Sequence, residues 1–283
     1  MKTAIILARG LYDTCHAKTA HGLIRHGKKY KIIGVIDENC AGKDAGEVIG
    51  LGRKSIPIVD EVFKADALII GVAPAGGKLP KEWREDIKKA IKLKMDIISG
   101  LHDFLSDDKE FANLAKKNGV KIIDVRKPTD KFQISSNRIP KVPVILTCGT
   151  DCAIGKRTVT IELYNEAIRR GIDAGFIATG QTGIMIGCDD GAVIDRIPGD
   201  FMSGAIEKMI ERVEKKGKKI IFVEGQGAIS HKVYGAVSLG ILYGANPNCI
   251  VLAHEPGRKY RESFPEQRVY EPLEEIKLLN ALS

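Results

Sequence analysis

The stretch from Gly149 to Thr158 reads GTDCAIGKRT and has the glycine and lysine spacing of a phosphate-binding loop. It follows the apolar run 143–148 and precedes the helical pattern 158–170, which is the strand, loop and helix order that such a loop requires. In this order, backbone N–H groups and the helix N-terminus hold phosphate oxygens while the lysine adds a positive charge. The residues predicted to bind a phosphate-bearing cosubstrate are Gly149, Thr150, Asp151, Cys152, Ala153, Ile154, Gly155, Lys156, Arg157 and Thr158.

The loop departs from the common GxxxxGK[ST] pattern at two places. One residue is added between the two glycines, and Arg157 separates Lys156 from Thr158. In the common pattern the hydroxyl directly after the lysine coordinates Mg²⁺, and a shift of one residue turns a helical side chain by about 100°. We therefore expect Gly155 and Lys156 to bind phosphate, but we do not expect Thr158 to coordinate magnesium.

Three further segments with polar or glycine residues come directly after apolar runs. Glu224 ends one such run, and the segments 179–183 and 254–258 follow the runs 174–178 and 250–253. Because the carboxyl ends of parallel strands meet at one edge of a sheet, we expect these segments beside the phosphate loop. The additional residues predicted to bind the cosubstrate are Gly180, Gln181, Thr182 and Gly183.

Three side chains in or near these segments are candidates for moving a proton. Glu224 is a candidate base or magnesium ligand, and the alternative is a carboxylate that caps the next loop. His231 and His254 are candidate bases because an unperturbed imidazole titrates near neutral pH. A structural or solvent-facing role is an equal alternative for each histidine. The predicted catalytic residues are therefore Glu224, His231 and His254, and no metal ligand is assigned.

Strand-like and helix-like segments alternate along the chain, which is typical of parallel sheets covered by helices on both faces. The predicted strands cover 3–8, 31–36, 67–72, 95–98, 120–125, 143–148, 174–178, 220–223 and 250–253. The predicted helices cover 18–26, 83–92, 158–170 and 201–215. A polar segment over 128–141 interrupts the pattern and is predicted as a linker. We therefore predict an α/β protein with one domain over 1–140 and a P-loop domain over 141–283.

The overall composition excludes several classes of protein. With 44% hydrophobic and 28% charged residues the chain is neither disordered nor fibrous, and no apolar run reaches the about 18 residues of a membrane span. The net charge is +8, but basic residues are scattered and aromatics are only 6%, so we expect a small anionic ligand and no nucleic acid. The six cysteines form no CxxC pair, and the N-terminus is predicted as a buried strand, so we expect a cytoplasmic protein with free thiols.

The first domain carries only a weak signal for a bound dinucleotide. Asp37 follows the second predicted strand, where a dinucleotide fold places its ribose-binding carboxylate. The segment 8–14 (ARGLYDT), however, lacks the second glycine that lets a pyrophosphate approach the backbone. The sequence therefore does not favour an NAD site in this domain.

The chain resembles a family of two-domain prokaryotic proteins that has long been described as a domain of unknown function. The matching motifs are KTAHGL (18–23), VIDENCAGKDAGEV (35–48), SGLHDFLSDD (99–108), DVRKP (124–128), GTDCAIGKRT (149–158), ATGQTGIMIG (178–187), VEGQG (223–227) and HEPGR (254–258). The resemblance implies a Rossmann-like N-terminal domain and a P-loop domain similar to that of dethiobiotin synthetase. It also implies that family members continue beyond the segment matching 272–282, with a strand whose asparagine faces a nucleotide base.

The resemblance implies a function as well, because some members of this family are N-acetyltransferases that act on D-glutamate with acetyl-CoA. Such a transfer needs a base for the substrate amine and donors for the oxyanion. The residues then expected to bind the amino-acid substrate are Gln226, Gly227, Arg196 and Arg258, with the arginines holding a carboxylate.

Two alternatives to acetyl transfer stay open at the level of the sequence. One is an ATP- and Mg²⁺-dependent ligase or kinase similar to dethiobiotin synthetase. The other is a non-catalytic protein that binds a nucleotide or metabolite. For any of the enzymes we expect several copies to associate, because symmetric homo-oligomers are common among such proteins.

Overall fold

The structure, a computed structural model, describes residues 1–72, 77–128 and 131–283. Its contacts divide the chain into two compact units. The first comprises Met1–Lys127 with Met185–Gly187, and the second comprises Pro128–Ile184 with Cys188–Ser283.

The polar segment predicted as a linker is grouped with the second unit, whereas the predicted first domain runs to residue 140. The reason lies in its contacts with helix α7 (Gly199–Lys215). Glu207 on this helix accepts hydrogen bonds from the Ser135 hydroxyl at 2.7 Å and from the Ser136 N–H at 3.0 Å. Residues 129–130 of the segment lie outside the described part of the chain.

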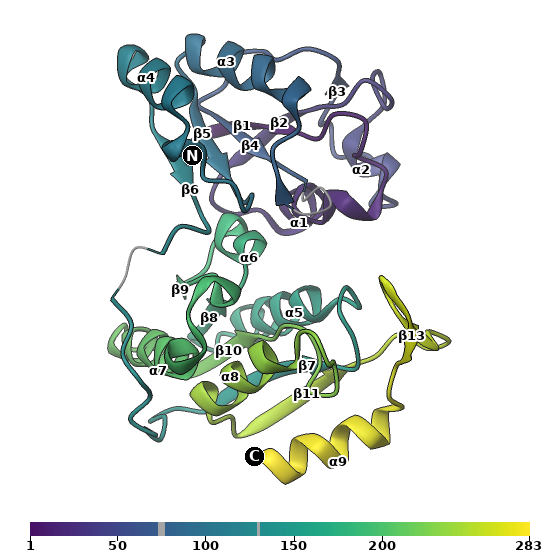
Figure 1. The fold of residues 1–283 in the computed structure, drawn as a ribbon, viewed down its shortest axis with the longest axis vertical. Coiled ribbons are helices and arrows are strands. Elements are labelled where there is room, and N and C mark those ends of the chain that lie inside the picture. The colour runs from purple at the N-terminus through teal and green to yellow at the C-terminus, as the bar shows by residue number, and fades with distance from the viewer. Residues whose placement is uncertain (73–76, 129–130) are drawn as a thin grey trace. The chain divides into compact units, whose positions relative to one another are not determined.

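The first unit is built on a parallel sheet of six strands in the order β3-β2-β1-β4-β5-β6 (Figure 1). This is the strand order of a dinucleotide-binding fold. The strands are β1 (Thr3–Leu7), β2 (Lys31–Ile36), β3 (Ile58–Val59), β4 (Ala67–Ile70), β5 (Asp96–Ser99) and β6 (Ile122–Asp124). The helices are α1 (Lys18–His26), α2 (Ala45–Val48), α3 (Arg84–Lys92) and α4 (Lys109–Asn118), with 3-10 turns at Cys15–Ala17, Lys81–Trp83 and Leu105–Asp107. Apart from Thr3, the central strands β1 and β4 consist of Ala, Ile and Leu buried on both faces, as is typical of parallel sheets.

The loops at the carboxyl edge of this sheet are tied together by Asp37. Its carboxylate accepts hydrogen bonds from the N–H groups of Tyr12 and Cys40, each at 2.9 Å, and the residue has no exposed surface. Asn39 also donates to the Gly10 carbonyl at 3.3 Å. A buried carboxylate that accepts hydrogen bonds from its own loops is not available to bind the hydroxyl groups of a ribose. The geometry therefore adds no support for a dinucleotide at Asp37.

The second unit is built on a parallel sheet of five strands in the order β11-β7-β10-β8-β9 (Figure 1). The strands are β7 (Val144–Gly149), β8 (Ala174–Ala178), β9 (Asp190–Gly191), β10 (Ile220–Glu224) and β11 (Cys249–Ala253). The helices are α5 (Lys156–Arg169), α6 (Gln181–Ile186), α7, α8 (Gly235–Ala245) and α9 (Pro272–Leu282), with a 3-10 turn at Ile194–Arg196. A separate antiparallel hairpin consists of β12 (Tyr260–Arg261) and β13 (Phe264–Arg268).

Helices cover both faces of the second sheet. Leu146 on β7 and Val223 on β10 belong to a core shared with α7 and α8. Ile145 and Phe222, which precede them in the two strands, pack instead with residues of α5. Because successive side chains of a strand point to opposite faces, the unit has three layers. The predicted fold class, two α/β units with parallel sheets, is confirmed.

Several elements differ from the sequence-based expectation. Helices α4, α8 and α9 were not predicted. Helix α8 (GAVSLGILYGA) is apolar on nearly every side and contacts both β7 and α7, so it lacks the one-sided pattern that reveals a surface helix. The glycine-containing segment 180–183 was predicted as a loop, and the structure places Gln181 at the start of helix α6.

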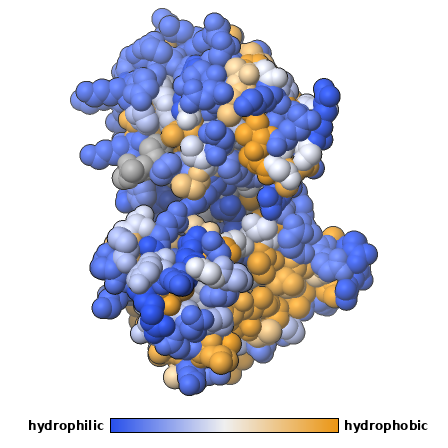
Figure 2. Space-filling model, turned by 90° about the vertical axis from the view of Figure 1, so that its right-hand side faces the viewer, coloured by the Kyte–Doolittle hydropathy of each residue, from blue (hydrophilic) through white to orange (hydrophobic). Residues whose placement is uncertain are grey.

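The surface adds two observations. No helix in the described ranges is long and apolar enough to cross a membrane. Figure 2 shows hydrophobic side chains gathered on one face of the second unit. Strand β11 forms an edge of the sheet in that unit, and its residues Ile250–Leu252 are only partly buried. The association of several copies stays a prediction.

Candidate active site

The phosphate loop joins β7 to α5, as the sequence order predicts. Gly155 precedes α5 in the left-handed region with φ of +92°, and Ala153 has φ of +55°. Gly149 has no room for a side chain, because a Cβ there would lie 2.8 Å from Ile154 Cδ1 and 3.0 Å from Lys156 Cδ. Glycine adopts the positive φ at position 155 and fits the narrow space at position 149 without strain, so the loop can wind tightly around the Lys156 side chain.

Lys156 lies inside the loop and spans it. Its side chain is buried, and Nζ donates a hydrogen bond to the Asp151 carbonyl oxygen at 2.5 Å. Burial lowers the pKa of Lys156, and the nearby Cys152 and Asp151 side chains oppose this effect. An added anion would favour the charged form of the buried ammonium, so the loop suits a phosphate group.

Asp151 connects the loop to the segments that follow β11. Its carboxylate has no exposed surface and lies 3.2 Å from Arg258 Nη1 and 3.3 Å from Arg261 Nη1. Burial by itself raises the pKa of Asp151, but backbone N–H donors and the two arginines outweigh it, so the pKa lies below its usual value. The carboxylate is therefore ionised and fully used within the protein.

His231 lies next to Asp151 but is oriented by its own loop. Its Nδ1 accepts from the N–H groups of Val233 at 3.2 Å and Tyr234 at 3.4 Å, so the neutral ring carries its proton on Nε2. Burial and the charge of Arg261 lower the pKa of His231, which keeps the ring neutral at pH 7. Because Nε2 then has no lone pair to offer, this arrangement does not suit the base role predicted for His231.

One group of potential metal ligands lies where His231 approaches the phosphate loop. Donor atoms of Asp151, Cys152 and His231 lie within 4.8 Å of one another. Asp151 is already paired with Arg258 and Arg261, and His231 Nε2 lies 3.8 Å from Asp151 Oδ1, beyond hydrogen-bond distance. A metal ion here would have to displace two guanidinium groups, so the cluster is better described as an ion-pair network.

Glu224 lies at the same sheet edge as the phosphate loop. It ends β10, whose partner β7 leads into the loop, and it pairs in register with Thr147. Its Oε2 accepts from the Thr179 N–H at 3.1 Å, and Gly183 lies so close that a Cβ would come within 2.7 Å of Oε2. Burial raises the pKa of Glu224, although Arg157, the N–H groups of Thr179 and Gly180, and Lys156 oppose the rise.

Hydrogen bonds join the segment 224–227 to Thr179, which lies just before α6. Gln226 Nε2 donates to the Thr179 carbonyl at 2.5 Å, and the Thr179 hydroxyl donates to the Glu224 carbonyl at 2.9 Å. Gly227 adopts φ of +55° and lies beside Tyr234 and Ser238. The predicted residues Thr182 and Gly183 are buried, and Gly180 and Gln181 are partly exposed. The structure thus brings the 180–183 and 224–227 segments together.

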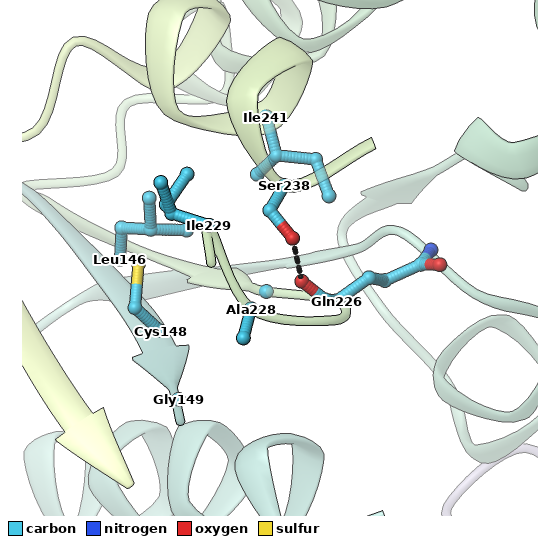
Figure 3. A pocket seen from close by; sticks show the side chains of 9 residues that line it. Leu146, Cys148, Gly149, Gln226, Ala228, Ile229, Ser238 and Ile241 are labelled. Atoms are coloured by element: carbon cyan, nitrogen blue, oxygen red, sulfur yellow. Dashed lines mark hydrogen bonds between the residues drawn. The ribbon is translucent and has the colours of Figure 1, made fainter. Parts of the chain in front are cut away.

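A small pocket opens beside the first residue of the loop. It is lined by Leu146, Cys148, Gly149, Gly225, Gln226, Ala228, Ile229, Ser238 and Ile241. Figure 3 shows Ser238 pointing toward Gln226, and its hydroxyl donates to the Gln226 carbonyl at 2.6 Å. Burial raises the pKa of Cys148 to about 12, so this thiol stays protonated. With a volume of about 10 Å³ the pocket has room for roughly one water molecule.

The remaining predicted residues occupy two places. His254 follows β11, and its Nδ1 lies 3.0 Å from the Thr150 hydroxyl. Arg258 is held by Asp151, by the Cys152 carbonyl at 2.9 Å and by Glu255 at 2.6 Å. Arg196 is exposed and ends the 3-10 turn that begins with a hydrogen bond from Ile194 N–H to the Thr179 carbonyl.

Two buried charged residues in this region were missed by the sequence analysis. Arg261 is 3% exposed, and its Nη2 donates to the Ser230 hydroxyl at 2.8 Å. Glu275 on α9 has no exposed surface and accepts hydrogen bonds from Ser230, from both its hydroxyl and its N–H. Both lie in stretches of mixed charge without a motif, so no sequence signal distinguishes them from surface residues.

Comparison with known proteins places the chain in a family. Residues 133–283 match the P-loop domain of DUF1611, which is described as a domain of unknown function, and residues 38–128 match its Rossmann-like N-terminal domain. The chain belongs to the DUF1611 family. A crystal structure of a DUF1611 family protein from Anabaena variabilis is 33% identical, with a TM-score of 0.92 over 100% of this chain and 82% of that chain.

Two curated relatives of this DUF1611 protein are named D-glutamate N-acetyltransferase. The one from Tritonibacter scottomollicae is 36% identical over 213 residues, and the one from a Pseudoalteromonas species is 38% identical over 206 residues. The matches cover 75% and 71% of this chain but 63% and 61% of those proteins. The chain thus spans less than two thirds of the length of these relatives. The family expected from the motifs is confirmed.

Proposed function

We propose that this DUF1611 protein is an N-acetyltransferase that moves the acetyl group of acetyl-CoA to the amine of a D-amino acid such as D-glutamate. The relatives named D-glutamate N-acetyltransferase support this choice of reaction and substrate. The observation that carries the chemistry is the buried Glu224 carboxylate, which is electrostatically coupled to Lys156 of the phosphate loop. The site therefore combines residues that can bind an anion with a carboxylate that can accept a proton.

The reaction forms a bond between the amine nitrogen and the acetyl carbon and breaks the thioester C–S bond. The attacking amine loses a proton, and the departing thiolate of CoA gains one. Glu224 is the proposed proton acceptor, because its burial raises the carboxyl pKa toward the pH at which a base works efficiently. His254 is the second candidate, and it lies next to Thr150 of the loop.

The binding roles divide between the loop and the arginines. The N–H groups of the loop and Lys156 would hold a phosphate group of CoA. Arg196 and Arg258 are the proposed ligands of the substrate carboxylate, as a guanidinium binds a carboxylate with two parallel hydrogen bonds. Arg258 would have to exchange its half-exposed partner Glu255 for the substrate, and the side chain of Arg196 is exposed to solvent.

Calorimetric titration is the first test of the cosubstrate. The purified protein is titrated with acetyl-CoA and, separately, with ATP, each in the presence of Mg²⁺ or of EDTA. We expect saturable binding of acetyl-CoA that does not need Mg²⁺, and little response to ATP. Binding of ATP alone, dependent on Mg²⁺ and followed by ADP formation, would move the protein to the ligase and kinase class.

A turnover assay tests the reaction itself. Release of CoA thiol is followed with D-glutamate, with L-glutamate and with no amino acid, and the product is identified by mass spectrometry. We expect N-acetyl-D-glutamate to form faster than its L-isomer. Tight binding of acetyl-CoA without acetylation of any amino acid would instead indicate a binding protein and would refute the proposed activity.

A further inference from the structure

Arg157 occupies the position at which nucleotide-binding P-loops carry their magnesium ligand. In those loops the residue directly after the lysine is Ser or Thr, and its hydroxyl coordinates Mg²⁺. Here helix α5 begins at Lys156, so Arg157 is the second residue of its first turn. Thr158 follows one position later and points about 100° away around the helix axis.

Arg157 lies in the first turn of α5, a helix that packs against the strand ending in Glu224. Helix α5 packs across β7, β8 and β10, and Glu224 is the last residue of β10. The Nε atom of Arg157 is buried, and Glu224 is the charged group that acts on it most strongly. Arg157 is also the first of the groups that offset the effect of burial on Glu224. The two residues are thus each other's electrostatic partners.

The other carboxylate at the loop forms ion pairs that, together with backbone N–H donors, outweigh the effect of its burial. Asp151 is paired with Arg258 and Arg261, at 3.2 Å and 3.3 Å. A divalent cation at the loop would therefore meet one carboxylate that two guanidinium groups already pair and a second one, Glu224, that is buried and influenced by the charge of Arg157. It would also face the buried ammonium of Lys156, so its entry would cost both desolvation and charge repulsion.

We propose that Arg157 takes the place of the Mg²⁺ ion of nucleotide-binding P-loops, so that this loop binds a phosphate-bearing cosubstrate without a divalent cation. A guanidinium stays charged at every physiological pH and offers several donors in a fixed plane, so it can supply constant positive charge beside bound phosphate. The inference rests on the proposed function only for the identity of the cosubstrate, a CoA thioester. It makes residue 157 the determinant of metal dependence.

The central variant is Arg157→Thr, which restores the Gly-Lys-Thr sequence of the common pattern and frees Glu224 for a cation. Binding of CoA is measured by calorimetry in EDTA and in Mg²⁺. We expect wild-type affinity to change by less than about twofold with Mg²⁺. In EDTA the variant should bind about tenfold more weakly, equivalent to about 1.4 kcal/mol, and Mg²⁺ should restore most of this loss.

Two matched variants identify the cause. Arg157→Lys keeps the positive charge, so its binding should stay independent of Mg²⁺. The double variant Arg157→Thr with Glu224→Gln removes the carboxylate that would hold the ion, so the rescue by Mg²⁺ should disappear. If Arg157→Thr binds CoA equally well in EDTA and Mg²⁺, or if the Lys variant becomes dependent on Mg²⁺, the inference is wrong.

A measurement on the wild-type protein covers the case in which the Thr variant does not fold. Mn²⁺ is titrated into the protein saturated with CoA, and free Mn²⁺ is followed by its electron paramagnetic resonance signal. No stoichiometric uptake is expected, and uptake of one equivalent would overturn the inference. The turnover assay in EDTA tests the proposed acetylation separately. A negative result there would not change the conclusion drawn from these binding measurements.

Discussion

Lys156 and Asp151 are joined inside the phosphate loop, where Nζ donates to the Asp151 carbonyl oxygen at 2.5 Å. The side chain of the same Asp151 pairs with Arg258 and Arg261, which lie more than 100 positions later in the chain. One residue therefore holds the loop's lysine with its backbone and the segments after β11 with its carboxylate. This relationship couples the anion site to the C-terminal part of the unit.

Lys156→Ala is expected to weaken binding of the phosphate groups specifically. The KM for acetyl-CoA should rise at least about tenfold, because a charge-assisted contact worth about 1.5–3 kcal/mol is lost. The KM for acetyl-pantetheine, which has no phosphate, should not change. Lys219→Ala is the control, since Lys219 is exposed and precedes β10 at the opposite end of the sheet. Equal losses for both cosubstrates would contradict phosphate binding by Lys156.

Asp151→Ala is expected to destabilise the fold. It leaves the buried Arg261 without its carboxylate partner, and breaking a buried ion pair from one side costs about 3–5 kcal/mol. Urea unfolding measures the loss. The control is Asp173→Ala, which removes an exposed partner of Lys218 and should change the unfolding free energy by less than about 1 kcal/mol. Similar losses for the two variants would show that the Asp151 network contributes little.

Glu224→Gln is expected to abolish the acid limb of the activity profile. The base must be ionised, and burial raises the pKa of Glu224. As the pH is lowered, kcat/KM of the wild type should therefore begin to fall at a pH above 4.5, the ordinary pKa of a glutamate. The variant should lose about 10²–10⁴-fold in kcat and show no such limb. Glu266→Gln, at an exposed position of β13, is the control. An unchanged profile in Glu224→Gln would transfer the base role to His254.

The same pKa shift predicts a change in stability with pH. Between pH 4.5 and the raised pKa, the folded protein binds more protons at Glu224 than the unfolded chain does. The contribution of Glu224 to the unfolding free energy therefore falls as pH rises through this window. Denaturant unfolding across the window should show a smaller decrease for Glu224→Gln than for the wild type. A steeper decrease in the variant would reverse the sign of the shift.

His231→Asn is expected to reduce the sensitivity of the fold to mild acid. Burial and Arg261 lower the pKa of His231, so below pH 6.5 the unfolded chain binds a proton that the folded protein does not. Stability is therefore lost as pH falls from 6.5 toward the lower folded-state pKa. Thermal unfolding from pH 7 to pH 5 compares the variant with His16→Asn, a change at an exposed histidine. If both variants match the wild type, His231 does not carry this dependence.

Local patterns account for much of the fold. The helix over 18–26 and the strand over 174–178 were predicted with the bounds that the structure has, because each has a regular apolar pattern and a clear breaker beside it. The phosphate loop was also predictable, since strand, loop and helix follow one another without interruption. Helix α8 was not predicted, because it packs on β7 and α7 and is apolar almost all round, so it has no one-sided apolar pattern.

The role assigned to His231 shows where sequence reasoning fails. A histidine after a glycine-rich strand end is a reasonable base from its position alone. Burial and the charge of Arg261 keep its ring neutral by lowering its pKa, and the N–H groups of Val233 and Tyr234 occupy Nδ1. Such partners depend on backbone orientation, which residue types do not reveal.

The sequence by itself determined the two α/β units, the DUF1611 motifs and the phosphate loop, because these depend on short-range order and on side-chain periodicity. Only the tertiary structure decided which carboxylates are available at the loop. Strand order β11-β7-β10-β8 brings Glu224 to the loop, and the chain after β11 returns Arg258 and Arg261 to Asp151. These contacts join residues far apart in the chain, and burial, which sets their energies, exists only in the folded protein.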